Sequence, residues 1–317
     1  MTEFLQLDLA PLLAATLASL VCGLLGNVLL LTRQSLLGDA VSHAVLPGIV
    51  AGFWVSGTRA ALPMVAGAVV AAIVGALLIG LTRRLARLEP GAAMGVVFSA
   101  MFALGLVLIE VSGARSVDLD LDCVLFGQLE TLIWPAATGL GSLADSAALA
   151  EFPAETVTLL VVLLVVLAVF AAVWKELGLV AFDPGFAASI GVNPSVVSAL
   201  VLVLVALACV ASFWAVGSIL VIAALVGPAV TARLLTDRYA LQFGLSAAAA
   251  VTMGAGGYAA AVAAPALLPG IEGVNAAGMI AVVAGGLVWL AWAFGPHGRR
   301  RGVAASAAPG HAAARHP

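Results

Sequence analysis

Residues 35–56 read SLLGDAVSHAVLPGIVAGFWVS, an apolar run that carries one aspartate and one histidine. The run is long enough for a helix that crosses the hydrocarbon core of a bilayer, which takes about 20 residues. On that helix Ser35, Asp39, Ser42 and His43 stand at i, i+4, i+7 and i+8 and form a single polar stripe. An ionisable side chain at the centre of a span costs about 2.5–3.5 kcal/mol, so such residues usually face a cavity on a transport path.

The composition indicates an integral membrane protein. Of the 317 residues, 63% are hydrophobic and 9% are charged, whereas about a quarter of an ordinary soluble domain is charged. The mean hydropathy is +1.20. Inside lipid every backbone amide needs an internal partner, so the long apolar runs must be helices rather than barrel strands. We predict an all-α polytopic membrane helix bundle of about 8–9 spans, at residues 9–32, 35–56, 60–82, 91–112, 154–174, 196–214, 216–235, 241–263 and 275–294.

The basic residues predict how the chain crosses the membrane. If Arg33 is cytoplasmic, alternation of the spans places all but two of the 13 basic residues on the inner side, leaving Arg59 and Arg115 outside. The N-terminus is then outside and the C-terminus inside. Residues 1–298 form the membrane domain, and residues 299–317 are expected to be a disordered cytoplasmic tail because their composition cannot bury a core.

Asp39 and His43 are the candidate metal ligands. A carboxylate and an imidazole one helical turn apart suit zinc, manganese or iron. The residues leave a second interpretation open, in which Asp39 caps a helix that starts after Gly38 and His43 bonds to a neighbouring carbonyl. Pro47 and Gly48 also allow two interpretations: a broken helix that exposes carbonyl groups to an ion path, or a packing kink.

The segment between the fifth and sixth predicted spans carries a short helix of its own. Asp183 suits the N-cap, Pro184 the first helical position and Gly191 the end. The exposed apolar face of this two-turn helix would consist of Phe186, Ala187 and Ile190. Such a face is expected to be covered, either by a partner protein or by the bilayer surface on which a connector helix lies flat.

Several motifs are missing from the sequence. Lys175 is the single lysine and follows a tryptophan, so the chain has no Walker-type phosphate cradle. If ATP drives this protein, the ATPase is another chain. The three cysteines have no Cys-x-x-Cys spacing, so neither a disulfide framework nor a thiolate metal site is expected. The connection over residues 111–154 is too long for a simple loop and should form short helices at the outer face.

The run from Ser35 to Gly48 closely resembles the hallmark of the zinc/manganese permease family of bacterial ATP-binding-cassette importers. Further segments look like family features in family order: residues 95–99, 102–105, the outer Asp-Leu-Asp that precedes residues 125–127, 181–184, and 216–221 through 228–233. The resemblance spans about residues 10–295 and is highly specific.

The resemblance implies a homodimeric permease of the type II importer class, similar in fold to the cobalamin-importer permease and located in the bacterial inner membrane. Its implied partners are a second copy of the chain, a cytoplasmic ATPase dimer, an extracytoplasmic metal-binding receptor and the surrounding lipid, with no nucleic acid. The chain is then not an enzyme and binds no permanent cofactor. Its cargo is a divalent metal, most simply zinc, with manganese or iron as alternatives.

The resemblance also assigns residues. Asp39 and His43 match the positions where metal coordination is expected, with Ser35 and Ser42 beside them on the translocation path. The family's coupling helix, which docks on the ATPase, corresponds to about residues 180–192 within the segment 176–192. The coupling residues are then Glu176, Phe182, Asp183, Pro184, Phe186, Ile190 and Gly191.

Two functions of other classes remain open. A secondary cation carrier or channel would use the same stripe without an ATPase, and it would not need the capped helix after Asp183. A structural or receptor-like membrane protein would carry no flux at all, so that replacing Asp39 or His43 would leave metal accumulation unchanged.

Overall fold

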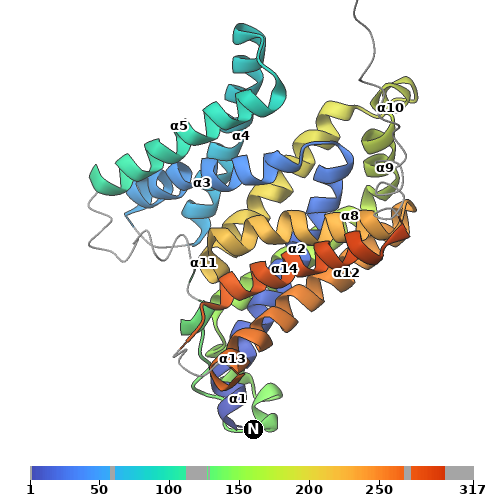
Figure 1. The fold of residues 1–317 in the computed structure, drawn as a ribbon. Helices are drawn as coiled ribbons and strands as arrows, with labels where there is room; N and C mark the ends of the chain where they lie inside the picture. The colour runs from blue at the N-terminus through green and yellow to red at the C-terminus, as the bar shows by residue number, and fades with distance from the viewer. Residues whose placement is uncertain (1, 58–60, 112–126, 128, 268–272, 297–317) are drawn as a thin grey trace, which may run out of the picture.

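The structure is a computed structural model that describes residues 2–57, 61–111, 127, 129–267 and 273–296. For some residues inside helices only the backbone is described, among them Ser35, Asp39, Ser42 and His43. Throughout the described residues the regular secondary structure is helical (Figure 1). The predicted all-α class is therefore confirmed.

The first half of the chain forms α1 (Thr2–Leu7), α2 (Leu9–Leu31), α3 (Ser35–Ser56), α4 (Ala61–Ala86) and α5 (Pro90–Val111). Three short helices follow, namely η2 (Leu129–Thr131), η3 (Leu140–Leu143) and α7 (Ser146–Ala150). The second half forms α8 (Ala154–Ala172), α9 (Trp174–Phe182), α10 (Pro184–Ser189), α11 (Pro194–Leu235), α12 (Tyr239–Val251), the π-helical turn η4 (Thr252–Gly256), α13 (Gly257–Leu267) and α14 (Ala276–Phe294).

Eight segments of the described chain are long and apolar enough to cross a membrane. They coincide with eight of the nine predicted spans, and the remaining one is α3, of which only Leu46–Ser56 counts as an apolar helix by itself. Two predicted spans, 196–214 and 216–235, belong to the single element α11. It bends at Gly217, whose φ of 74° and ψ of 171° are not helical. That backbone region is essentially restricted to glycine, so Gly217 fixes where α11 breaks.

The centre of the molecule is α2, which packs against α8, α11 and α12. Its small residues let the neighbouring backbones come close, as is common in membrane helix packing. A Cβ atom on Gly26 would collide with the backbone carbonyl of Leu225 on α11, and one on Gly23 would press on Pro228. The contact between α2 and α11 is therefore made by backbone as well as side chains.

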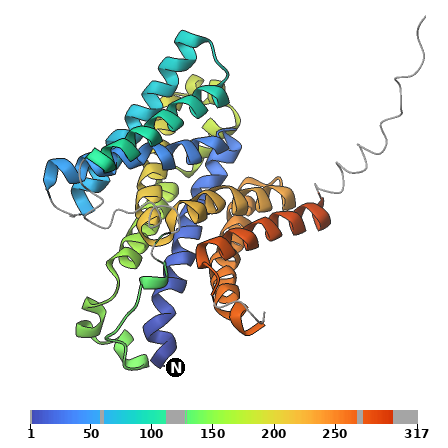
Figure 2. The ribbon, with the colours of Figure 1, turned by 60° about the vertical axis from the view of Figure 1, so that its left-hand side comes forward.

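Helices α3, α4 and α5 form a second group that packs on α11, and Figures 1 and 2 both show it standing beside the α2 bundle. Gly48 of α3 and Gly67 of α4 face each other so closely that a Cβ on either would collide with the other's carbonyl. This second group carries the predicted polar stripe.

The end of the molecule near the N-terminus is covered by α1 and by residues 129–152. Trp134 is fully buried there, with its backbone N–H donating to the Gln6 carbonyl at 2.8 Å and its indole N–H donating to the Ala148 carbonyl at 2.8 Å. The Gln6 side chain donates to the Ala137 carbonyl at 2.8 Å. The short helices predicted in this connection are confirmed for residues 129–150, whereas residues 112–126 and 128 lie outside the described part.

Candidate metal path and coupling segment

A tight elbow sets the start of the stripe-bearing helix. After α2 ends, the Gln34 N–H donates to the Leu29 carbonyl at 2.7 Å, and Arg33 adopts a left-handed φ of 57°. A non-glycine residue in this region carries a conformational cost, so the turn must be held by its surroundings. The elbow fixes Ser35 as the first residue of α3.

The four stripe positions lie on one continuous helix, as predicted. Since α3 begins at Ser35, its backbone lines up positions 35, 39, 42 and 43. The interpretation in which Asp39 caps a helix that starts after Gly38 is wrong, because α3 begins four residues before Asp39. The side chains of Ser35, Asp39, Ser42 and His43 lie outside the described part, so metal contact at these positions stays a prediction.

A small apolar hollow adjoins the turn of α3 that carries positions 39 and 43. Ala40 and Ala44 are almost completely buried and line it from α3, facing side chains of α4, α5 and α11. Its empty volume is about 240 Å³, part of it open to the surroundings. The other lining residues are Ala72, Gly75, Ala76, Ile79, Val97, Phe98 and Leu202. These apolar side chains offer no ligand to a cation.

Pro47 and Gly48 do not break the helix. The helical backbone of α3 runs through Pro47 to Ser56. Gly48 meets Gly67 backbone to backbone, and a Cβ on Gly105 of α5 would press on Leu46 and Pro47. Of the two interpretations, the packing role is the one that these contacts support.

The candidate coupling segment consists of two helices, α9 and α10, with Asp183 at the turn between them. The Asp183 carboxylate accepts a hydrogen bond from the Phe186 N–H at 2.9 Å, Pro184 is the first residue of α10, and Gly191 follows with a φ of 90°. The capped two-turn helix is confirmed. Its boundaries differ from the predicted 180–192, because residues up to Phe182 belong to α9.

The apolar face of this segment differs in one member from the prediction. Ala187 is fully buried, because α10 packs back against α9 and α11. The side chains exposed instead are Phe182 (60%), Phe186 (54%) and Ile190 (53%), which we call the α9–α10 patch. Glu176 lies in the first turn of α9 and is half-buried.

An aromatic contact that holds α9 in place was not predicted from the sequence. Trp174 packs against two rings of α12, with ring-centroid distances of 4.7 Å to Tyr239 and 4.9 Å to Phe243. Spacing alone could have placed Tyr239 and Phe243 on one face of a helix, but not opposite Trp174. We call Trp174, Phe182, Tyr239 and Phe243 the aromatic cluster.

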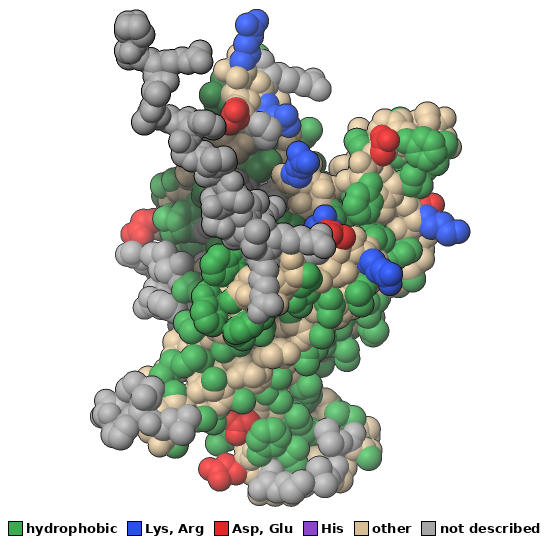
Figure 3. Space-filling model, turned by 45° about the vertical axis from the view of Figure 1, so that its right-hand side comes forward, with side chains coloured by type: hydrophobic (Ala, Val, Ile, Leu, Met, Phe, Trp, Pro, Cys, Tyr) green, Lys and Arg blue, Asp and Glu red, His purple; other side chains and the backbone are tan. Residues whose placement is uncertain are grey.

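The charges are distributed unevenly along the molecule. On the face shown in Figure 3, Lys and Arg side chains gather in the upper part, among several acidic side chains, whereas the acidic side chains at the lower end have no basic side chain beside them. The N-terminus lies at that lower end (Figure 1). The two ends of this face therefore differ in their basic side chains, and the side of the membrane on which each end lies stays a prediction.

These features define a polytopic membrane protein with a continuous stripe-bearing helix and a separate capped segment at one end. The chain matches the family described as the ABC 3 transport family over residues 2–134 and 149–291, and it belongs to that family. It is thus the membrane permease subunit of a metal ATP-binding-cassette transporter, and the ATPase of such a system is a separate chain.

Relatives of this chain carry names that refer to different metals. The chain is 35% identical over 231 residues to the manganese transport system membrane protein MntD of Bacillus subtilis, covering 73% of this chain and 75% of that protein. It is 35% identical to the zinc transport system membrane protein TroD of Treponema pallidum (68% and 56% covered). It is 38% identical to the chelated iron transport system membrane protein YfeD of Yersinia pestis (70% and 65% covered).

A solved structure shares the fold. A chain of PsaBC from Streptococcus pneumoniae in complex with Fab superposes with a TM-score of 0.75 and 25% sequence identity, covering 93% of this chain and 94% of that chain. The likeness extends over nearly all of the described helices, so the family assignment from sequence and the arrangement of the helices agree.

Proposed function

We propose that this chain forms the metal pathway of an ATP-driven importer and that zinc is its cargo. The observation that carries the proposal is the unbroken backbone of α3, which keeps positions 39 and 43 one turn apart on a single helix face. Two copies of the chain around an axis near this turn would offer two carboxylates and two imidazoles, a set that suits tetrahedral zinc. Manganese or iron is the alternative cargo, and manganese would recruit further oxygen ligands.

We expect the other subunits of the transporter to bind at the two ends of the molecule. The α9–α10 patch is the docking surface for a cytoplasmic ATPase dimer, and the opposite end, with α1 and residues 129–152, faces an extracytoplasmic receptor. The C-terminus then lies in the cytoplasm, and the protein sits in the inner membrane as a homodimer. Binding and hydrolysis of ATP would rock the two copies between outward-open and inward-open states.

A secondary carrier is the competing function, and the coupling segment argues against it. A carrier driven by an ion gradient has no use for the α9–α10 patch, which exposes three large apolar side chains next to a capped helix. Vesicles that contain the chain together with ATPase subunits unable to hydrolyse ATP separate the two functions. Zinc uptake should cease for the importer, whereas continued uptake would identify a carrier.

The metal role of the stripe is tested by Asp39→Ala and His43→Ala in proteoliposomes that contain the complete transporter. Loss of even an indirect metal-site partner typically lowers metal affinity by about 10–100-fold, so each variant should reduce zinc uptake at least tenfold. The control is Thr158→Val on α8, because the Thr158 hydroxyl is exposed and donates only to its own helix, at Ala154. Uptake by Asp39→Ala equal to that of the control would contradict the proposed ligand role.

A further inference from the structure

Helix α12 presents two different faces to two different neighbours. Tyr239 and Phe243, one turn apart, belong to the aromatic cluster and face α9, where Phe182 also reaches Tyr239 at 5.9 Å between ring centroids. Gln242 and Ser246, also one turn apart, are fully buried against α2. A single helix thus contacts the coupling segment on one side and the central helix α2 on another.

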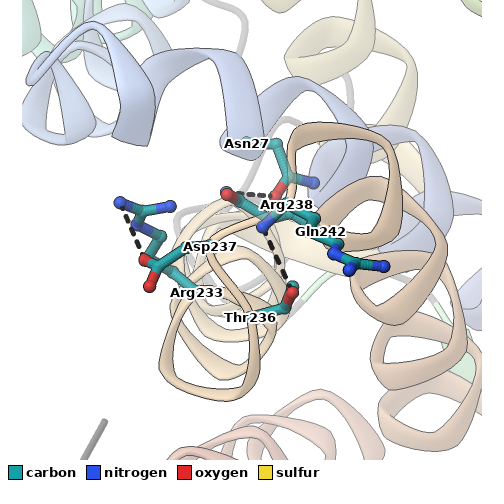
Figure 4. A network of polar contacts seen from close by, with 6 residues as sticks. All are labelled: Asn27, Arg233, Thr236, Asp237, Arg238 and Gln242. Carbon is teal, nitrogen blue, oxygen red and sulfur yellow. Dashed lines mark hydrogen bonds and ion pairs between the residues drawn. The ribbon is translucent and has the colours of Figure 1, made fainter.

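The contact between α12 and α2 is polar. The Gln242 amide donates to the Asn27 side-chain oxygen at 3.0 Å, and Asn27 in turn donates to the Gly23 carbonyl at 2.9 Å. Figure 4 shows the two side chains pointing toward each other from α12 and α2. Ser246 donates to the same Gly23 carbonyl at 3.1 Å. The connection is directional, so it specifies the register of α12 along α2.

The Asn27–Gln242 pair contributes little to the stability of the contact between α2 and α12. Within the described part of the chain, the Gln242 side-chain oxygen is buried and has no hydrogen-bond partner. An unsatisfied buried carbonyl offsets what the neighbouring hydrogen bond contributes, and such bonds in membrane proteins contribute little on average. A pair of apolar side chains would fill the same space at no such cost, so stability alone does not account for Asn27 and Gln242.

Helix α9 is connected to α2 by two routes. On the direct route α9 packs against α2, and Leu177 and Val180 of α9 line a small hollow together with Thr32 and Gln34 of the elbow before α3. The route through α12 consists of ring contacts at one end and hydrogen bonds at the other. Among the residues that the structure describes, only the second route contains polar side chains whose hydrogen bonds fix the position of one helix along another.

We infer that Asn27 and Gln242 are positioning residues that transmit movement of the coupling segment to α2 and onward, through the elbow, to the stripe on α3. The ATPases would move α9 and α10, the aromatic cluster would move α12 with them, and the amide pair would move α2. This role rests on the proposed function, because it presupposes an ATPase that docks on the α9–α10 patch.

The test replaces the pair by apolar side chains of similar shape, Asn27→Leu together with Gln242→Met, in the full transporter with its ATPase and receptor. The amount of ATPase that copurifies and the unfolding temperature should equal or exceed those of the wild type, since the unsatisfied carbonyl is removed as well. The zinc transported per ATP hydrolysed should fall about fivefold or more, the lower end of typical coupling between sites. Thr231→Val is the matched control, because the buried Thr231 hydroxyl donates only within its own helix, to Gly227.

Transport per ATP within twofold of the wild type would overturn the role of the pair. If the double variant does not fold, Tyr239→Leu decides instead, because it cuts the same route at the aromatic cluster and leaves both amides in place; normal coupling in that variant overturns the inference. A wild-type transporter that takes up no metal with ATP contradicts the proposed function. A wild type and a double variant that transport equally well contradict only the role of Asn27 and Gln242.

Discussion

Helices α2 and α11 can pack closely at Gly26 because glycine has no side chain. The α2 backbone approaches the carbonyl of Leu225 so closely that a methyl group has no room. We predict that Gly26→Ala lowers the free energy of unfolding by at least about 1–3 kcal/mol, the usual cost of overpacking, because a backbone carbonyl cannot move aside as a side chain can. Thermal unfolding in detergent measures the change.

Gly285 on α14 is the control for that substitution, since a Cβ there meets no atom within 4 Å. Gly285→Ala should leave stability unchanged or raise it by up to about 1 kcal/mol, because alanine favours the helix over glycine. Equal unfolding temperatures for Gly26→Ala and the wild type would show that α2 and α11 do not meet as described.

Asp183 is a second residue whose role can be tested by a single substitution. Its carboxylate caps α10, and a lost cap costs about 1 kcal/mol of local helix stability. We predict that Asp183→Ala weakens ATPase binding to the permease several-fold, as measured by copurification at increasing salt, because the α9–α10 patch is no longer held in one geometry. Asp145→Ala removes the equivalent cap of α7, on the Ala147 N–H at the other end of the molecule, and should leave ATPase binding unchanged.

At the scale of elements, the break in α11 depends on Gly217. Its φ of 74° and ψ of 171° cost a side-chain-bearing residue about 1–3 kcal/mol, and a Cβ on Gly127 would collide with the same backbone at Val216 and Gly217. We predict that Gly217→Ala lowers the unfolding temperature, with Gly244→Ala as the control because Gly244 lies in the helix α12 with open space around it. Matching unfolding curves for the two variants would argue against the break.

The sequence predicted elements well where the determinants are local. Length and hydropathy predict the spans, and Asp183, Pro184 and Gly191 predict the capped helix α10, because caps and turns depend on residues a few positions apart. The boundary between the predicted spans 196–214 and 216–235 lies close to the break at Gly217, although the continuation of both spans as one bent helix was not predicted. The π-helical turn at Thr252–Gly256 was not predicted either, since an apolar run looks the same with or without it. Ala187 was expected on the surface because its burial depends on how α10 packs, which residue types alone do not reveal.

Contacts between residues far apart in the sequence could not be predicted either, because they also depend on how the helices pack. Asn27 and Gln242 are separated by 215 positions, and nothing local to either residue indicates the other. The candidate stripe could be read from spacing, because its members share one helix and four helical positions suffice to define a face. What lies opposite that face depends on the packing of α3 against its neighbours and on the second copy of the chain.

At the scale of the whole molecule, the two ends differ in charge and should lie on opposite sides of the membrane. We predict that a membrane-impermeant maleimide added to intact cells labels Ser146→Cys on α7 but not Ser195→Cys at the start of α11, both of which are exposed positions. The native Cys22 and Cys209 are buried, and Cys123 is replaced by serine in the background. Labelling of Ser195→Cys alone would invert the orientation.

The hydrogen bonds that join Gln6 of α1 to Trp134 and Ala137 also bear on how the protein is made. Gln6 and its acceptor Ala137 are 131 positions apart. At about 5–20 residues per second, a ribosome needs roughly 7–26 s to supply the second partner after the first. During that interval the Gln6 amide lacks its acceptor on Ala137, so this end of the molecule closes only after α2, α3, α4 and α5 have been synthesised.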